Sequence, residues 1–405
     1  MKRNALIAFA TLLLICLGAL ASVTGGEDCA FVGPTVYPSP TASPIHDGVV
    51  LTSDGKIVAV GKRGTVKIPK SARVIDCTGK TLVAGFWNSH VHFLDNAWLN
   101  AEKAPAEKLE KHMQVMLSQW GFTTVWDLGS DPSNSLALRR RVESGEIPGP
   151  RILLAGNLFP KNGHPVYLPP EMQLPEAATP EEAAQMAQNY MRLGLDGIKL
   201  FTGSYMGNKP VVNMDISIVK AAVDVAHAQN KPVFAHPQNH TGVDNAAAGG
   251  VDILAHTIPT ESDFTAEELA RFKTQGTGLI PTLTLWTTVV QDAAVANGLV
   301  ASGIQQLKTF SANGGPILFG TDVGFTANYD TTLEFEFMGR ALSGNEILAS
   351  LTTNPAAYFK AANKGRVEKG FDADLVILDG DPAADVRNLA QVAYTIRAGR
   401  IIYRK

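Results

Sequence analysis

The chain has 405 residues, of which 45% are apolar and 18% charged, and its formal net charge is −3. This composition is typical of a globular protein with a substantial core, organised as one large domain and a small one. The near-neutral balance, without a basic stripe that alternates with aromatic residues, argues against nucleic acid as a partner and favours a small molecule.

The N-terminus has the pattern of a secretory signal peptide. Lys2 and Arg3 precede an apolar run over residues 5–21, which closes with the small-x-small pattern of a cleavage site. We therefore predict a signal peptide over residues 1–21 and a secreted or periplasmic mature chain that has no membrane association after cleavage. The alternative is a retained membrane anchor, but the run is short of the roughly 20 residues that a spanning helix needs.

Removal of this segment leaves two cysteines, Cys29 and Cys77. An oxidising compartment permits a disulfide between them. Two separate buried thiols are the equal alternative, because pairing requires a closeness that the sequence does not give.

Both ends of the mature chain have β-like patterns. Apolar runs at residues 48–51 and 56–60 flank an Asp-Gly pair, which predicts a hairpin. Similar patterns return at residues 369–378 and 391–403, after the rest of the chain. The economical arrangement is a small β-sandwich domain built from residues 22–84 and 362–405.

Between these ends, strand and helix patterns alternate, which indicates parallel pairing with helical crossovers. Ala-rich amphipathic patterns at residues 181–193 and 216–229 are examples of the helices. Eight such units over residues 85–361 predict an α/β fold with a closed (β/α)₈ TIM barrel. After the first strand, at residues 85–93, the strand candidates are residues 123–126, 151–154, 197–200, 233–236, 253–256, 278–281 and 317–320.

The first barrel strand carries His90 and His92, one residue apart. Alternate side chains of a strand share a face, so the two imidazoles can reach one metal ion. The C-terminal ends of parallel barrel strands meet at one mouth, where active sites form. Four further residues that suit a metal site or its chemistry occupy such ends: Lys199, His236, His256 and Asp322.

These six residues resemble the ligand set of the amidohydrolase superfamily, and residues 353–357 and 370–376 are similar to segments common in that family. Residues 196–199 and the context of His256 are most similar to its imidazolonepropionase-like and prolidase-like branch. The resemblance implies two divalent metal ions, with zinc as the first choice. His90, His92 and Asp322 would bind the more buried ion, His236 and His256 the more exposed one, and Lys199, carbamylated by carbon dioxide, would bridge them. A salt-bridged Lys199 and a single-metal site are the alternatives.

The resemblance implies a metal-dependent, dipeptidase-like amidohydrolase that cleaves C–N bonds in a small molecule such as a dipeptide or an N-acyl amino acid. Two metals would lower the pKa of a shared water so that it exists as hydroxide near neutral pH. Asp322 would act as the general acid/base, taking a proton from that water and passing it to the leaving group. The alternatives are a phosphotriester or lactone hydrolase on the same site and a non-catalytic barrel homologue.

The sequence departs from the family pattern in front of the histidine pair, where Asn88 replaces the usual Asp. Four loop residues beyond strand ends are the candidates for substrate binding: His164, Tyr205, His240 and Trp286. The substrate, the native metal and the formation of a homo-oligomer are left open by the sequence.

Overall fold

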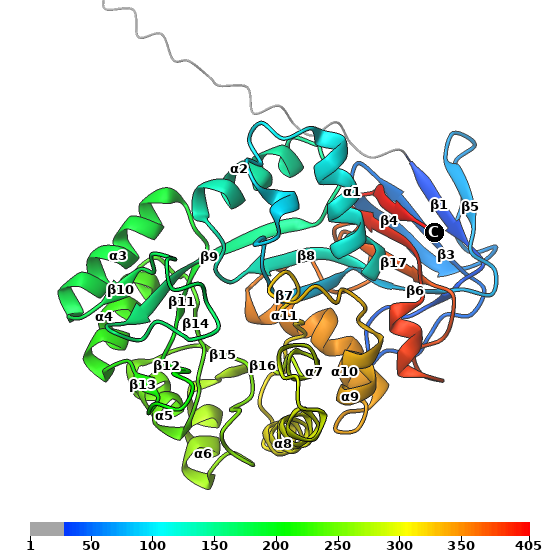
Figure 1. Cartoon of the computed structure of the whole chain (residues 1–405). Coiled ribbons are helices and arrows are strands. Elements are labelled where there is room, and N and C mark those ends of the chain that lie inside the picture. The colour runs from blue at the N-terminus through cyan, green and yellow to red at the C-terminus, as the bar shows by residue number, and fades with distance from the viewer. Residues whose placement is uncertain (1–27) are drawn as a thin grey trace, which may run out of the picture.

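The computed structural model describes residues 28–405, and the predicted signal peptide lies outside these residues. Strands from both ends of the chain gather on one side of a ring of strands and helices (Figure 1). Among the residues described, no helix has both the length and the apolar character that a membrane span requires.

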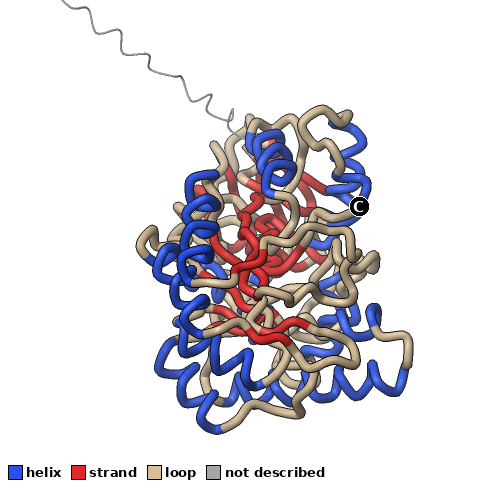
Figure 2. The backbone as a smooth tube through the Cα atoms, turned by 60° about the vertical axis from the view of Figure 1, so that its left-hand side comes forward, coloured by secondary structure: helices blue, strands red, loops and turns tan. Residues whose placement is uncertain are grey.

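The ring is a parallel barrel with the strands inside and the helices outside (Figure 2). Seven strands follow each other in chain order around it, and the short strand β10 (Glu176–Ala177) extends β9. The seven are β7 (Phe86–Val91), β8 (Phe122–Asp127), β9 (Arg151–Pro160), β11 (Gly197–Leu200), β14 (Val233–Ala235), β15 (Ile253–Ala255) and β16 (Gly278–Ile280). The predicted TIM barrel is confirmed.

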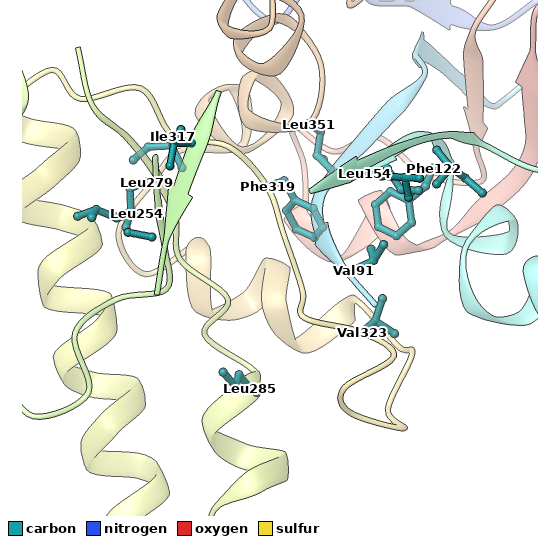
Figure 3. Packing of buried hydrophobic residues seen from close by; sticks show 14 of the residues in the cluster. Val91, Phe122, Leu154, Leu254, Leu279, Leu285, Ile317, Phe319, Val323 and Leu351 are labelled. Atoms are coloured by element: carbon teal, nitrogen blue, oxygen red, sulfur yellow. The ribbon is translucent and has the colours of Figure 1, made fainter. Parts of the chain in front are cut away.

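The prediction of a regular eighth strand at residues 317–320 is wrong. This segment closes the barrel through single bridges, from Ile317 to Leu279 in β16 and from Val323 to Val91 in β7 (Figure 3). Between them, Asp322 adopts a left-handed backbone conformation with φ of +61°. The amide of Phe319 donates to the carbonyl of Ser350 at 3.0 Å instead of to a neighbouring strand, and the conformation of Asp322 prevents an extended ladder beyond it.

Helices connect the strands and cover the outside of the barrel. They are α1 (Ala106–Met116), α2 (Pro132–Glu143), α3 (Pro180–Leu193), α4 (Ile216–His227), α5 (His240–Gly249), α6 (Ala266–Gln275), α7 (Leu285–Val289), α8 (Ala293–Ala312), α9 (Thr332–Met338), α10 (Gly344–Leu351) and α11 (Thr353–Tyr358), with short 3₁₀ helices η1 (Asn96–Trp98), η2 (Ser118–Trp120) and η3 (Val386–Ala390). Both helices predicted above are formed, as α3 and α4. The side chain of Thr179 caps α3 and that of Asp215 caps α4.

The β domain consists of two sheets around a common apolar core that includes Phe31, Leu82 and Ile377. The first sheet has the order β4 (Lys56–Lys62), β3 (Gly48–Ser53), β1 (Cys29–Val32), β5 (Arg73–Asp76). The second has the order β19 (Arg400–Arg404), β18 (Val392–Arg397), β17 (Leu375–Leu378), β6 (Thr81–Ala84), β2 (Thr35–Val36). The two chain ends therefore mix in the second sheet. A further hairpin, β12 (Gly203–Ser204) with β13 (Val212–Asn213), lies in the loop after β11.

Two smaller predictions about the N-terminal part are settled by this domain. The hairpin joins β3 to β4, and Asp54 and Gly55 both have positive φ, which is typical of a tight hairpin turn. Cys77 is a buried free thiol whose Sγ donates to the carbonyl of Ile75 at 3.7 Å. The disulfide alternative is therefore not realised, and burial raises the pKa of this thiol to about 12.

Candidate metal centre

Three of the predicted ligands form a compact cluster at the mouth of the barrel. Asp322 Oδ1 lies 2.8 Å from His92 Nε2 and 3.2 Å from His90 Nε2. The candidate ligand atoms of these three residues all lie within 4.8 Å of one another. A cation between them could therefore contact two imidazoles and one carboxylate.

The backbone explains why Asp322 reaches the two histidines. The amide of Asp322 donates to the carbonyl of His90 at 2.9 Å, and the amide of His92 donates to the carbonyl of Val323 at 2.8 Å. Gly324, with φ of +96°, follows immediately, and a Cβ at this position would lie 1.8 Å from the carbonyl oxygen of His92. Only glycine permits this close approach, so Gly324 allows the segment around Asp322 to lie directly against β7.

Asn88, the departure from the family pattern, links the two sides of the cluster. Its Nδ2 donates to Thr321 Oγ1 at 2.8 Å, and its Oδ1 accepts from the amide of His90 at 3.1 Å. The amide side chain thus supplies both a donor and an acceptor, which a carboxylate in the same place could not do when ionised. Asn88 positions His90 and the residue before Asp322.

The other two histidines adjoin this cluster. The ring centroid of His256 lies 4.7 Å from that of His90 and 4.8 Å from that of His236. His256 Nε2 is 3.8 Å from Asp322 Oδ2, while His256 Nδ1 is 2.6 Å from Thr282 Oγ1. The Thr282 hydroxyl therefore fixes the ring, and His256 Nε2 faces the cluster.

Backbone strain is concentrated at the same place. His256 has φ of +119°, Asp322 +61° and Thr282 +45°, all conformations that residues other than glycine rarely adopt. Each costs on the order of 1–3 kcal/mol and is typical of functional sites, where the surrounding fold holds the residue in place. Here Glu334 contributes to that support, since its carboxylate accepts hydrogen bonds from the amides next to Thr282, those of residues 283 and 284.

Lys199 is buried at the end of β11, with 1% of the residue exposed. Burial lowers the pKa of its amine to about 7, although the charge of Asp322 opposes the shift. Its Nζ lies 5.8 Å from the ring centroid of Phe201, which in turn stacks on His236 at 4.8 Å. The structure therefore brings Lys199 to the same buried region as the histidines.

Burial keeps three of the histidines, His90, His236 and His256, in the neutral state that binds metals. Burial, followed by the charge of Lys199, lowers the pKa of His236 to about 3 and that of His90 well below its usual value. Burial also lowers the pKa of His256 well below its usual value. Neutral imidazoles keep a lone pair for a cation.

The residues present fit a bound cation. Asp322 Oδ1 is buried and accepts no hydrogen bond from the described residues, although two imidazole nitrogens lie within 3.2 Å of it. His236 Nε2 is likewise buried without a hydrogen-bond partner among those residues. Buried polar atoms are normally satisfied. Atoms that approach closely without hydrogen-bond geometry are expected where their lone pairs converge on a cation.

The four residues predicted to contact substrate have different surroundings. Trp286 is 9% exposed, and its ring centroid lies 6.5 Å from that of His256, so it borders the centre. His164 places its ring nitrogens 3.1 and 3.2 Å from two backbone carbonyls of its own loop. His240, the first residue of α5, lies 2.8 Å from Glu268, and Tyr205 is 42% exposed.

Sequence reasoning missed two aromatic residues near the centre. Phe325, three residues after Asp322, has its ring centroid 6.5 Å from that of His92, and Tyr167 packs on Phe325 at 5.6 Å. Burial, followed by the charge of Asp322, raises the pKa of the Tyr167 hydroxyl, although 41% of the residue is exposed. Tyr167 lies in the same loop as His164, and the sequence does not indicate which loop side chains approach the centre.

Fold and centre together define a (β/α)₈ barrel of the metal-binding class. A model of the amidohydrolase family matches residues 81–402. The chain belongs to this family, as the sequence predicted.

Several known proteins are similar to this chain in sequence or in structure. An uncharacterised protein of Mycobacterium bovis and two of Mycobacterium tuberculosis are each 30% identical over 195 residues, which is 44% of this chain and 50% of theirs. The chain thus spans about half the length of the curated relatives it matches. A Bifidobacterium longum protein named as a candidate prolidase is 26% identical with a TM-score of 0.79, covering 94% of this chain and 95% of its own. A Xaa-Pro dipeptidase with bound methionine shares the fold at 22% identity and a TM-score of 0.77, over 94% of this chain and 100% of its own.

Proposed function

We propose that this protein hydrolyses amide- or peptide-like C–N bonds in a small molecule such as a dipeptide or an N-acyl amino acid. The observation that carries the proposal is the buried Asp322 Oδ1, which lies within 3.2 Å of two imidazoles and accepts no hydrogen bond from the described residues. Family membership and the similarity to a protein named as a candidate prolidase support the choice of a C–N bond.

The proposal includes two divalent ions. His90, His92 and Asp322 would hold one, and His236 and His256 the other, with zinc as the first choice because imidazoles and a carboxylate suit it. When bound, such ions acidify water and polarise a carbonyl group.

Lys199 is proposed to become a carbamate that bridges the two ions. The lone pair of its neutral Nζ would form a bond to the carbon of carbon dioxide, and the nitrogen would release one proton, which leaves an anion with two oxygens. The lowered pKa of about 7 supports this role, since a substantial fraction of the amine is neutral near pH 7.

Asp322 is proposed to move the proton during the reaction. Its Oδ1 is directed into the centre, so it can take a proton from the attacking water and give it to the leaving nitrogen, which then departs as a neutral amine. Trp286 would form an apolar wall beside His256, and the Tyr167 hydroxyl would donate a hydrogen bond to the substrate.

The test combines metal content with a substrate panel. The purified chain is loaded with zinc, its metal content per chain is measured, and it is assayed with dipeptides, N-acyl amino acids, a phosphotriester and a lactone. We expect about two ions per chain and turnover of at least one C–N substrate. The Asp322→Asn variant should lose this turnover, and Asp330→Asn, at an exposed carboxylate, should keep it.

Two results would contradict the proposal. Turnover of the phosphotriester or the lactone alone would show that the substrate class is wrong. A fully metal-loaded chain that hydrolyses nothing in the panel would favour the non-catalytic alternative.

A further inference from the structure

A cavity of about 490 Å³ lies at the end of the barrel opposite to the metal centre. Its lining includes Arg151, the first residue of β9, and Asp196, Pro232 and Asp252, which immediately precede β11, β14 and β15. The predicted metal ligands, in contrast, lie at or beyond the C-terminal ends of their strands. The cavity is therefore a separate site at the N-terminal end of the barrel, and its volume is in the range of small-molecule sites, roughly 300–1,000 Å³.

Aromatic side chains form much of its wall. Trp87 and Trp126 are buried residues of β7 and β8, and Tyr358 and Phe359 lie at the end of α11. Phe359 stacks on Trp87 with 5.8 Å between ring centroids and lies 5.0 Å from Trp126. Such walls favour a planar apolar group.

The carboxylates of the cavity are already engaged. Asp196 accepts from Arg139 Nη1 at 2.7 Å and from the amide of Leu154 at 3.1 Å. Asp252 Oδ2 accepts from the amide of Val233 at 2.7 Å and lies 2.9 Å from a ring nitrogen of His227. Neither carboxylate therefore needs a ligand to satisfy it.

Two cations of the cavity remain available. Arg151 and Lys360 are exposed, and neither makes a side-chain hydrogen bond or ion pair with the described part of the chain. Lys360 also has φ of +55° directly after the cap of α11, a position that glycine or asparagine usually occupies. The left-handed conformation is unfavourable for lysine, and such a mismatch between residue type and backbone conformation is typical of functional positions.

A buried donor adds to these cations. The indole Nε1 of Trp126 has no hydrogen-bond partner within the described residues, although the residue is only 2% exposed. Buried donors of this kind call for an acceptor.

We propose that this cavity binds an aromatic small-molecule anion, with its ring against the aromatic wall that includes Trp87 and Phe359 and its charged oxygens on Arg151 and Lys360. The recognition chemistry is that of a ring bearing one oxyanion group, such as an aromatic carboxylate or sulfonate. The inference is independent of the proposed hydrolysis.

The experiment is a titration of the metal-loaded full chain with benzenesulfonate, followed by calorimetry. A sulfonate is chosen because it is a weaker metal ligand than a carboxylate and so reports less on the metal centre. We expect one saturable site per chain, and at least tenfold weaker binding in the Arg151→Gln/Lys360→Gln double variant. The matched Arg140→Gln/Lys308→Gln variant, which changes exposed residues of α2 and α8, should bind as the unchanged chain does.

Further measurements test the contributions of the ring and of the charge to binding. Benzyl alcohol, which has the ring without the charge, and sodium sulfate, which has the charge without the ring, should both bind at least tenfold more weakly than benzenesulfonate. Lys360→Gly should weaken benzenesulfonate binding while raising the thermal unfolding midpoint, which separates a ligand-binding lysine from a structural one. No saturable binding, equal binding in the double variant, or equal binding of sulfate would each overturn the inference.

Discussion

The carboxylates at the two ends of the same barrel have opposite hydrogen-bonding states. At the N-terminal end, Asp196 accepts from the amide of Leu154, and Asp252 accepts from the amide of Val233, so each carboxylate stabilises the backbone at a neighbouring strand. At the C-terminal end, Asp322 Oδ1 and His236 Nε2 are buried without hydrogen-bond partners among the described residues.

This difference shows which feature identifies a functional site. Both ends carry aspartates, histidines and lysines, so residue type alone does not separate them. What separates them is the state of the carboxylates: those of the N-terminal end accept hydrogen bonds from backbone amides, whereas Asp322 Oδ1 at the mouth accepts none from the described residues and belongs to a residue with strained backbone. Polar groups that the protein itself does not satisfy are expected where a ligand completes the structure.

The largest effect should come from the carboxylate at the mouth. Asp322→Asn keeps the shape of the side chain but removes the proton acceptor, and we expect kcat to fall by about 10³-fold while at least one metal ion stays bound. Initial rates and metal analysis of the same preparation measure the two quantities. Unchanged turnover would remove the proton-transfer role of Asp322.

Removal of the buried amine should act mainly through the metal. Lys199→Ala deletes the proposed bridge, and we expect the metal content to fall to about one ion per chain or less, with activity reduced by about 10²-fold or more. Lys220→Ala, at an exposed lysine of α4, is the control and should keep both values. Full metal occupancy in the Lys199 variant would show that the lysine does not bridge.

A smaller effect on metal binding is expected from Thr282, which lies 2.6 Å from His256 Nδ1. Thr282→Val preserves the shape but removes the hydroxyl, so His256 loses its orientation, and metal affinity should weaken by about 10–100-fold. Competition with a metal chelator measures the affinity. Thr287→Val, in the neighbouring helix α7, should have no such effect, and equal affinities in both variants would show that the hydroxyl does not orient the ligand.

The hydroxyl of Tyr167 should affect the substrate more than the metal. Tyr167→Phe removes one donor near Asp322, and we expect kcat/KM to fall by about tenfold, the value of one hydrogen bond to a polarised group, with unchanged metal content. Tyr205→Phe is the matched control, because Tyr205 is as exposed as Tyr167, 42% against 41%. If the Tyr205 variant lost as much activity as the Tyr167 variant, the predicted substrate role of Tyr205 would be favoured instead.

The sequence predicted features that follow from the regular alternation of side chains along a strand. It did not predict features that depend on contacts between segments distant in the chain. His90 and His92 could be placed on one face because side chains alternate with a period of two. The loss of the eighth strand could not be predicted, because it depends on the hydrogen bond from the Phe319 amide to the distant Ser350 and on the left-handed turn at Asp322. The position of Tyr167 was equally hidden, since its loop has no periodic pattern.

The cavity at the N-terminal end could not be predicted from the sequence either, because its residues precede several strands and follow α11.

The smallest effect is expected from Lys360→Gly, which tests whether this lysine at the N-terminal end of the barrel has a structural role. The left-handed conformation of Lys360 costs a residue with a Cβ about 1–2 kcal/mol, whereas glycine loses roughly 0.5–1 kcal/mol more backbone entropy on folding. The free energy of unfolding, measured by urea denaturation, should therefore rise by about 0.5 kcal/mol. The same change at Lys308, within α8, should lower it by about 1 kcal/mol, since glycine is unfavourable inside a helix. A stability loss at Lys360 would mean that its side chain supports the fold.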